Sequence, residues 1–149
     1  MSLQVAIMAK MKEAMKAKDQ VALTSLRAIK AELLLAQTAT GSKVELTEAD
    51  EIKLIQKLVK QRKDSATIFT DQNRPDLAEP ELAQVAVIEQ FLPEQLSEEE
   101  LLKIVTETIS NLSASGMKDM GKVMAAVNTE VAGKADGKTI SALVKKNLM

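Results

Sequence analysis

The chain has 149 residues, with 20 Lys and Arg against 21 Asp and Glu, and it contains no cysteine and no histidine. Cysteine and histidine supply most zinc ligands, and histidine is the commonest catalytic acid or base, so this composition argues against zinc sites, disulfides and ordinary acid–base catalysis. From the sequence we assign no catalytic residue, no metal and no cofactor.

The charges are unevenly distributed. Residues 1–70 carry 12 basic and 8 acidic side chains, residues 71–110 carry 2 and 10, and residues 111–149 carry 6 and 3. Basic ends would attract a polyanion, whereas the acidic middle would repel it or meet a basic protein. Ordinary solvated helices show similar asymmetry, so both interpretations stay open.

No uncharged stretch is long enough to cross a bilayer, and no N-terminal signal is visible. We therefore expect a cytoplasmic protein without membrane contact.

Glycine and proline are scarce while Ala, Leu, Lys, Glu and Met dominate, which predicts an all-α chain. The first helix should end near Lys18, and Asp19 should cap a second helix over residues 20–37. Thr47 should cap a long third helix, and Pro75 suits the first turn of a fourth. Apolar residues at helical spacing predict inward faces in these helices: Leu3, Ile7, Met11, Ala14 and Met15; Ala22, Leu26, Ile29 and Leu33; Ile52, Ile55, Val59, Ala66 and Phe69; Leu77, Val85, Ile88 and Leu92.

Pro93 should end the fourth helix, because the residue before a proline avoids helical conformation. Ser97 and Glu100 form a capping box at the start of a fifth helix, a sixth follows Met120, and Asp136 should cap a seventh. We therefore expect an N-terminal bundle of about four helices over residues 1–93 and a C-terminal three-helix bundle over residues 94–149.

Two kinds of residue are interpreted structurally. Arg62 falls on the apolar side of the third helix, where it needs a carboxylate or carbonyl partner, so it should act as a clamp. Methionines at helical spacing are expected to fill the core rather than bind a ligand; these are Met8, Met11, Met15, Met120 and Met124.

Four of the five glycines lie among lysines near the C-terminus. The run GKADGK at residues 133–138 joins two predicted helices, where free backbone N–H groups, a helix dipole and two ammonium groups can meet an anion. On the sixth helix, Gly121, Ala125 and Ala132 leave a side with little bulk for a sugar-phosphate backbone. Helix capping and tight packing would explain the same residues.

Other chemistry is weakly indicated. Ser113 and Ser115 lie near Lys118, as in a serine–lysine nucleophile, but turn formation explains them as well. The acidic residues 94–100 suggest a metal site, but carboxylates also suit a helix start. No P-loop pattern is present, and the only aromatic residues, Phe69 and Phe91, belong to apolar stripes. RNA binding here would therefore depend on lysines and on salt.

Several sequence runs resemble the GatB/YqeY family over nearly the whole chain. They are VKQRKDS at 59–65 followed by Phe69, RPDLAE at 74–79, FLPEQLS at 91–97, MKDMGKVM at 117–124 and GKADGK at 133–138. The chain differs from the usual family pattern at Phe91, often Tyr, at Pro80 and Leu82 in a usually acidic run, and at Ala125, often Gly.

The resemblance implies a helical N-terminal domain followed by a domain like the tail of the GatB subunit of the glutamine-dependent tRNA amidotransferase, which holds tRNA. Transferred to this sequence, it implies RNA contact by these residues: Lys118, Gly121, Lys122, Gly133, Lys134, Gly137, Lys138 and, with Lys146 as a weaker addition, Lys145. The amidotransferase's kinase and transamidase chemistry belongs to a large catalytic domain for which this chain is too short.

Three hypotheses follow. The first is a tRNA-binding accessory, with tRNA or another structured RNA, and not DNA, as its partner. The second is a protein–protein adaptor for translation-related proteins, using the acidic segment 76–100 and the face formed by Lys53, Lys57 and Lys60. The third is a component with carbon–nitrogen ligase activity, which only the family resemblance suggests.

Overall fold

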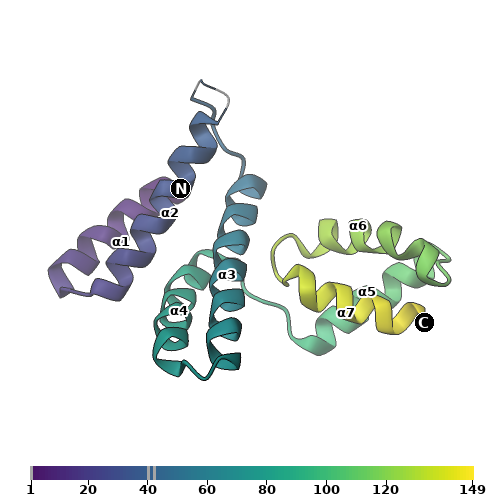
Figure 1. The fold of residues 1–149 in the computed structure, drawn as a ribbon. Helices are drawn as coiled ribbons and strands as arrows, with labels where there is room; N and C mark the ends of the chain where they lie inside the picture. The colour runs from purple at the N-terminus through teal and green to yellow at the C-terminus, as the bar shows by residue number, and fades with distance from the viewer. Residues whose placement is uncertain (1, 40, 42) are drawn as a thin grey trace. The chain divides into compact units, whose positions relative to one another are not determined.

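The computed structural model describes residues 2–39, 41 and 43–149, and within them the chain forms α-helices and two short 3₁₀ turns without any strand (Figure 1). The predicted all-α class is confirmed. The chain divides into two compact units, Met1–Leu92 and Pro93–Met149.

The N-terminal unit contains four helices and one 3₁₀ turn: α1 (Leu3–Ala17), α2 (Gln20–Thr38), α3 (Glu48–Asp71), α4 (Pro75–Ile88) and η1 (Glu89–Phe91). α3 and α4 form a hairpin, and α2 contacts α1 and α4 (Figure 1). Ile7, Leu26, Ile29, Ile55 and Ile88 are fully buried where these helices meet. The core of this unit therefore draws on all four helices.

The C-terminal unit consists of three helices and a 3₁₀ turn: α5 (Glu98–Asn111), η2 (Met117–Asp119), α6 (Met120–Val131) and α7 (Gly137–Leu148). Its core is built from short branched side chains spaced at helical intervals. The buried set is Leu101, Val105, Val123, Val127, Val131, Ala135, Ile140, Val144 and Leu148. Each of the three helices contributes to this core from one apolar face.

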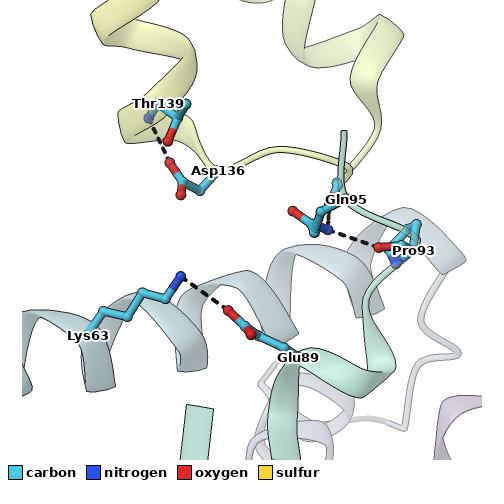
Figure 2. A network of polar contacts seen from close by, with 7 residues as sticks. Lys63, Glu89, Pro93, Gln95, Asp136 and Thr139 are labelled. Carbon is cyan, nitrogen blue, oxygen red and sulfur yellow. Dashed lines mark hydrogen bonds and ion pairs between the residues drawn. The ribbon is translucent and has the colours of Figure 1, made fainter. Parts of the chain in front are cut away.

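Local signals in the sequence set the starts of the helices. Asp19 accepts from the N–H of Ala22 at 3.0 Å at the start of α2, and Asp136 accepts from the N–H of Thr139 at 2.7 Å at the start of α7 (Figure 2). Thr47 caps α3 by accepting from the N–H of Asp50, and the predicted capping box of Ser97 and Glu100 precedes and enters α5. Each bond satisfies a backbone donor that the first turn of a helix leaves without a partner.

Arg62 joins two helices of the N-terminal unit, as predicted. Its Nε donates to Oε1 of Gln84 on α4 at 2.9 Å, and its Nη1 donates to the carbonyl of Leu58 on α3 at 3.2 Å. Nearby, Lys63 Nζ lies 3.1 Å from a carboxylate oxygen of Glu89 (Figure 2). Polar contacts thus accompany the apolar packing of α3 on α4 and η1.

Some predicted core positions are wrong. Met8 and Met15 are 47% and 54% exposed, because the buried side of α1 is defined by Leu3, Ile7 and Ala14. Leu77 is 38% exposed, and its neighbour Ala78 lies inward instead. Ala78 and Val85 are seven residues apart and so fall on one side of the helix. Helix α4 ends at Ile88, and η1 fills the gap before Pro93.

Candidate nucleic-acid interface

The predicted RNA-binding residues occupy the helix ends and the connecting loop of the α6–α7 hairpin. Lys118 lies in η2, Gly121 and Lys122 lie in the first turn of α6, and Lys145 lies in the last turn of α7. The others lie in the loop 132–136 or in the first turn of α7: Gly133, Lys134, Gly137 and Lys138.

The hairpin separates these lysines into two groups. α6 and α7 run in opposite directions, joined by the loop 132–136 (Figure 1). α6 has 12 residues, so it is about 18 Å long. Lys118 and Lys122 therefore lie at one end of the hairpin and Lys134 and Lys138 at the other, while α7 brings Lys145 back towards the first end.

All five of these lysines are exposed, and none forms an ion pair with the residues that the structure describes. Half of the eight carboxylates of this unit lie on α5, where Glu98, Glu99, Glu100 and Glu107 are exposed, and three lie among the lysines, at Asp119, Glu130 and Asp136. The C-terminal unit therefore has one acidic helix and a basic hairpin. An arrangement of this kind orients an approaching polyanion towards the hairpin.

The GKADGK loop is less open to a single anion than its sequence indicates. The carboxylate of Asp136 caps α7 by accepting from Thr139, so a negative charge already lies at that helix terminus. The N–H of Lys134 donates to the carbonyl of Val131 at 2.9 Å. The two lysine side chains remain exposed, whereas the backbone donors of the loop are partly used.

Gly133 and Gly121 have different structural roles. Gly133 is buried and has a φ of +86°, a conformation that favours glycine, so the loop itself requires it. Gly121 is exposed, and a Cβ added there would meet nothing within 4 Å. Ala125 on α6 and Ala132, which directly follows the helix, are exposed as well, and the predicted close approach of a phosphate backbone stays a prediction.

Two contacts that sequence reasoning missed hold the loop. Gln95 Nε2 donates to the carbonyl of Gly133 at 3.0 Å, and the N–H of Leu96 donates to the carbonyl of Lys134 at 2.8 Å. The FLPEQLS and GKADGK runs therefore meet in space. Their separation in the chain carries no periodic signal, so only the packed structure shows that they meet.

The other candidate chemistry has simple structural explanations. Ser113 has a φ of +50°, and the N–H of Ser115 donates to Asp119 Oδ2 at 2.9 Å, which are features of the turn before η2. Among the described residues, no group of three or more acidic side chains is placed to hold a metal ion. Nor does any helix in that part of the chain have the length and apolarity needed to cross a membrane.

The fold and this surface define a protein of two small helical units, with a basic hairpin in the second. The family model described as "Yqey-like protein" matches residues 4–148. The chain belongs to this family, which confirms the resemblance drawn from its motifs.

Curated relatives cover most of the chain. The Altered inheritance of mitochondria protein 41, mitochondrial, of Pyrenophora tritici-repentis is 32% identical over 131 residues, which cover 87% of this chain and 71% of that protein. The protein of the same name from Clavispora lusitaniae is 31% identical over 126 residues, 82% of this chain and 72% of that protein. An uncharacterized protein of Schizosaccharomyces pombe is 32% identical over 96 residues, 64% of this chain and 76% of that protein.

Two of these names place the relatives in mitochondria. The cytoplasmic location of the present chain stays a prediction.

Proposed function

We propose that this protein is an accessory that binds structured RNA, tRNA above all, through phosphate contacts from the α6–α7 hairpin. The observation that carries the proposal is the placement of exposed lysines at both ends of this hairpin, where they form no ion pair with any described residue. The preference for tRNA is supported by the resemblance of this unit to the tail of the GatB subunit.

The spacing of the lysines favours an extended ligand. Two groups of lysines at opposite ends of a helix about 18 Å long do not form a site for one phosphate, but they match a folded nucleic acid that presents phosphates along its surface. The C-terminal unit itself contains no aromatic side chain on which a base would stack, because Phe69 and Phe91 both belong to the N-terminal unit. Recognition would therefore read backbone shape and would weaken as salt increases.

The first experiment measures binding of the intact protein to bulk tRNA by fluorescence anisotropy at two salt concentrations, with double-stranded DNA for comparison. We expect salt-sensitive binding that prefers tRNA. If the protein binds neither nucleic acid at low salt, the proposal fails.

Charge reversal at each end of the hairpin then tests the site. One variant carries Lys118→Glu and Lys122→Glu, and the other carries Lys134→Glu and Lys138→Glu. Each should weaken tRNA binding and lower the slope of log affinity against log salt by about 1 for each phosphate that the variant no longer neutralises. If only one variant weakens binding, the proposal that RNA lies along the whole hairpin is wrong.

The chain offers a matched control. Lys12 and Lys16 on α1 have the same spacing of four residues and are also exposed, but they lie in the N-terminal unit. Changing both to Glu alters the net charge by the same amount and should leave tRNA binding almost unchanged. Equal weakening in this control would show that overall charge, not the hairpin, governs binding.

A further inference from the structure

A half-open cavity of about 260 Å³ lies in the N-terminal unit, between α1, the start of α2 and the end of α4 with η1. Its apolar lining includes Ala14, Ala22, Leu26 and Phe91. Ala14 and Leu26 are buried, so the floor of the cavity belongs to the apolar core of this unit. Sites for drug-sized ligands usually exceed about 300 Å³, so this cavity suits a group the size of one side chain.

Hydrogen-bond acceptors dominate the polar edge of the cavity, which is formed by Lys10, Glu13, Asp19 and Gln90. Glu13 Oε2 accepts from Lys10 Nζ at 3.0 Å, and Asp19 Oδ1 accepts from the N–H of Ala22 at 3.0 Å. The second oxygen of each carboxylate and the amide oxygen of Gln90 make no hydrogen bond with the part of the chain that the structure describes. Three acceptors therefore remain for a ligand.

The charge at this edge favours a cation. Lys10 neutralises one of the two carboxylates, which leaves a formal charge of about −1 on the three ionised groups. The site is less suited to an anion, because the Lys10 ammonium is paired with Glu13 and the N–H of Ala22 already donates to Asp19. Phe91 adds an aromatic ring, whose face attracts cations.

We infer that this cavity binds a guanidinium group on an aliphatic stem, as in an arginine side chain. A guanidinium is planar, stacks on an aromatic ring and offers five N–H donors, which suits several acceptors around one edge. The stem would lie along the alanines of the apolar wall. The inference concerns the N-terminal unit and does not depend on RNA binding by the hairpin.

Matched ligands test the chemistry. The peptide acetyl-Gly-Arg-Gly-amide is titrated into the full-length protein labelled with ¹⁵N, beside analogues in which Lys or citrulline replaces Arg, and beside free arginine. The Arg peptide should shift the amide signals of Ala14, Ala22 and Phe91. The Lys peptide should bind more weakly, and the citrulline peptide, which has nearly the same shape without the charge, should not bind.

Comparing the Arg peptide with free arginine shows whether the bound guanidinium belongs to a polypeptide or to the amino acid. Tighter binding of the peptide identifies an arginine within a polypeptide, and tighter binding of free arginine identifies the amino acid. Equal binding of the citrulline and arginine peptides overturns the inference, as does the absence of any shift at millimolar concentration.

Two variants that should change the affinity for the Arg peptide in opposite directions test the charge argument. Glu13→Gln should weaken binding of the Arg peptide about tenfold, because it removes a charge-assisted hydrogen bond. Lys10→Gln should strengthen it, because the nearest competing cation is removed. Glu45→Gln, an exposed control outside the cavity lining, should change nothing. If Lys10→Gln and Glu13→Gln shift the affinity in the same direction, the charge argument is wrong.

Asp19→Asn tests the contribution of the Asp19 carboxylate to binding without destabilising the fold, because asparagine caps helices about as well as aspartate. Circular dichroism should be unchanged while binding weakens. tRNA affinity should stay at its original value in all these variants, so a failure here is distinguishable from a failure of the RNA proposal.

Discussion

The side-chain amide of Gln95 donates a hydrogen bond to the carbonyl of Gly133 at 3.0 Å, and the same nitrogen donates to the carbonyl of Pro93 at 2.9 Å (Figure 2). The backbone N–H of the next residue, Leu96, donates to the carbonyl of Lys134. The start of the C-terminal unit therefore fixes the loop that carries one of the proposed RNA-binding lysines.

Gln95→Leu should loosen this loop. The substitution keeps a similar volume and removes two hydrogen bonds, so we expect the stability of the C-terminal unit to fall by about 1 kcal/mol. Hydrogen exchange of the backbone amides at 132–136 should accelerate. Gln61→Leu, at an exposed position on α3, is the control. Equal acceleration of exchange at 132–136 in this control would contradict a specific role of Gln95 in holding the loop.

Gly133→Ala and Gly137→Ala should differ, although both glycines belong to the GKADGK run. Gly133 has a φ of +86°, where an added Cβ costs about 1–2 kcal/mol. At Gly137 a Cβ would meet nothing within 4 Å, and alanine limits the unfolded chain, so stability should stay level or rise slightly. Urea unfolding followed by circular dichroism compares the two variants. Equal destabilisation would contradict the conclusion that only Gly133 is required by its backbone conformation.

Gly121→Ala separates folding from RNA binding. Alanine in a helix is more stable than glycine by about 0.5–1 kcal/mol, and the space beside Gly121 is open, so α6 should become more stable. Under the proposed function, tRNA affinity should fall, because the added methyl group obstructs the closest approach of a phosphate backbone. Unchanged affinity in a stabilised variant would show that the RNA does not approach α6 at this point.

Arg62→Lys should destabilise the N-terminal unit by about 1 kcal/mol despite keeping the charge. A lysine cannot reproduce the fork that reaches both Gln84 and the carbonyl of Leu58. Thermal unfolding of Arg62→Lys, Gln84→Leu and the double variant forms a cycle. Because the two side chains share a hydrogen bond, their effects should not add, and simple additivity would argue against the coupling.

Asp50 should contribute to the decrease of stability in acid. Hydrogen bonds from the Thr47 hydroxyl and then its backbone N–H lower the pKa of the Asp50 carboxyl below its ordinary value of 3.8. A folded-state pKa below the unfolded value gives stability that is present above about pH 3.8 and is lost as the pH falls through the folded value. Carboxyl NMR titration should give a lowered pKa, and Thr47→Val should raise it. A value of 3.8 or more in the unmodified protein would contradict the capping box.

The sequence by itself determined the all-α class, the family and the starts of the capped helices. Asp19, Thr47, Ser97 and Asp136 all cap as predicted, because a cap joins a side chain to a backbone group only two or three residues away. Such bonds need no knowledge of the rest of the fold.

Only the tertiary structure decided which of several apolar residues on one helix lies inward, as Ala78 does beside the exposed Leu77. It also separated the predicted RNA-binding lysines between the two ends of a hairpin, brought Gln95 to Gly133 and left a cavity beside Phe91. These features depend on how helices pack against one another. Helical periodicity defines the apolar face of each helix. It does not determine which helix covers that face or where gaps remain, because both depend on how side chains that are distant in the sequence fit together.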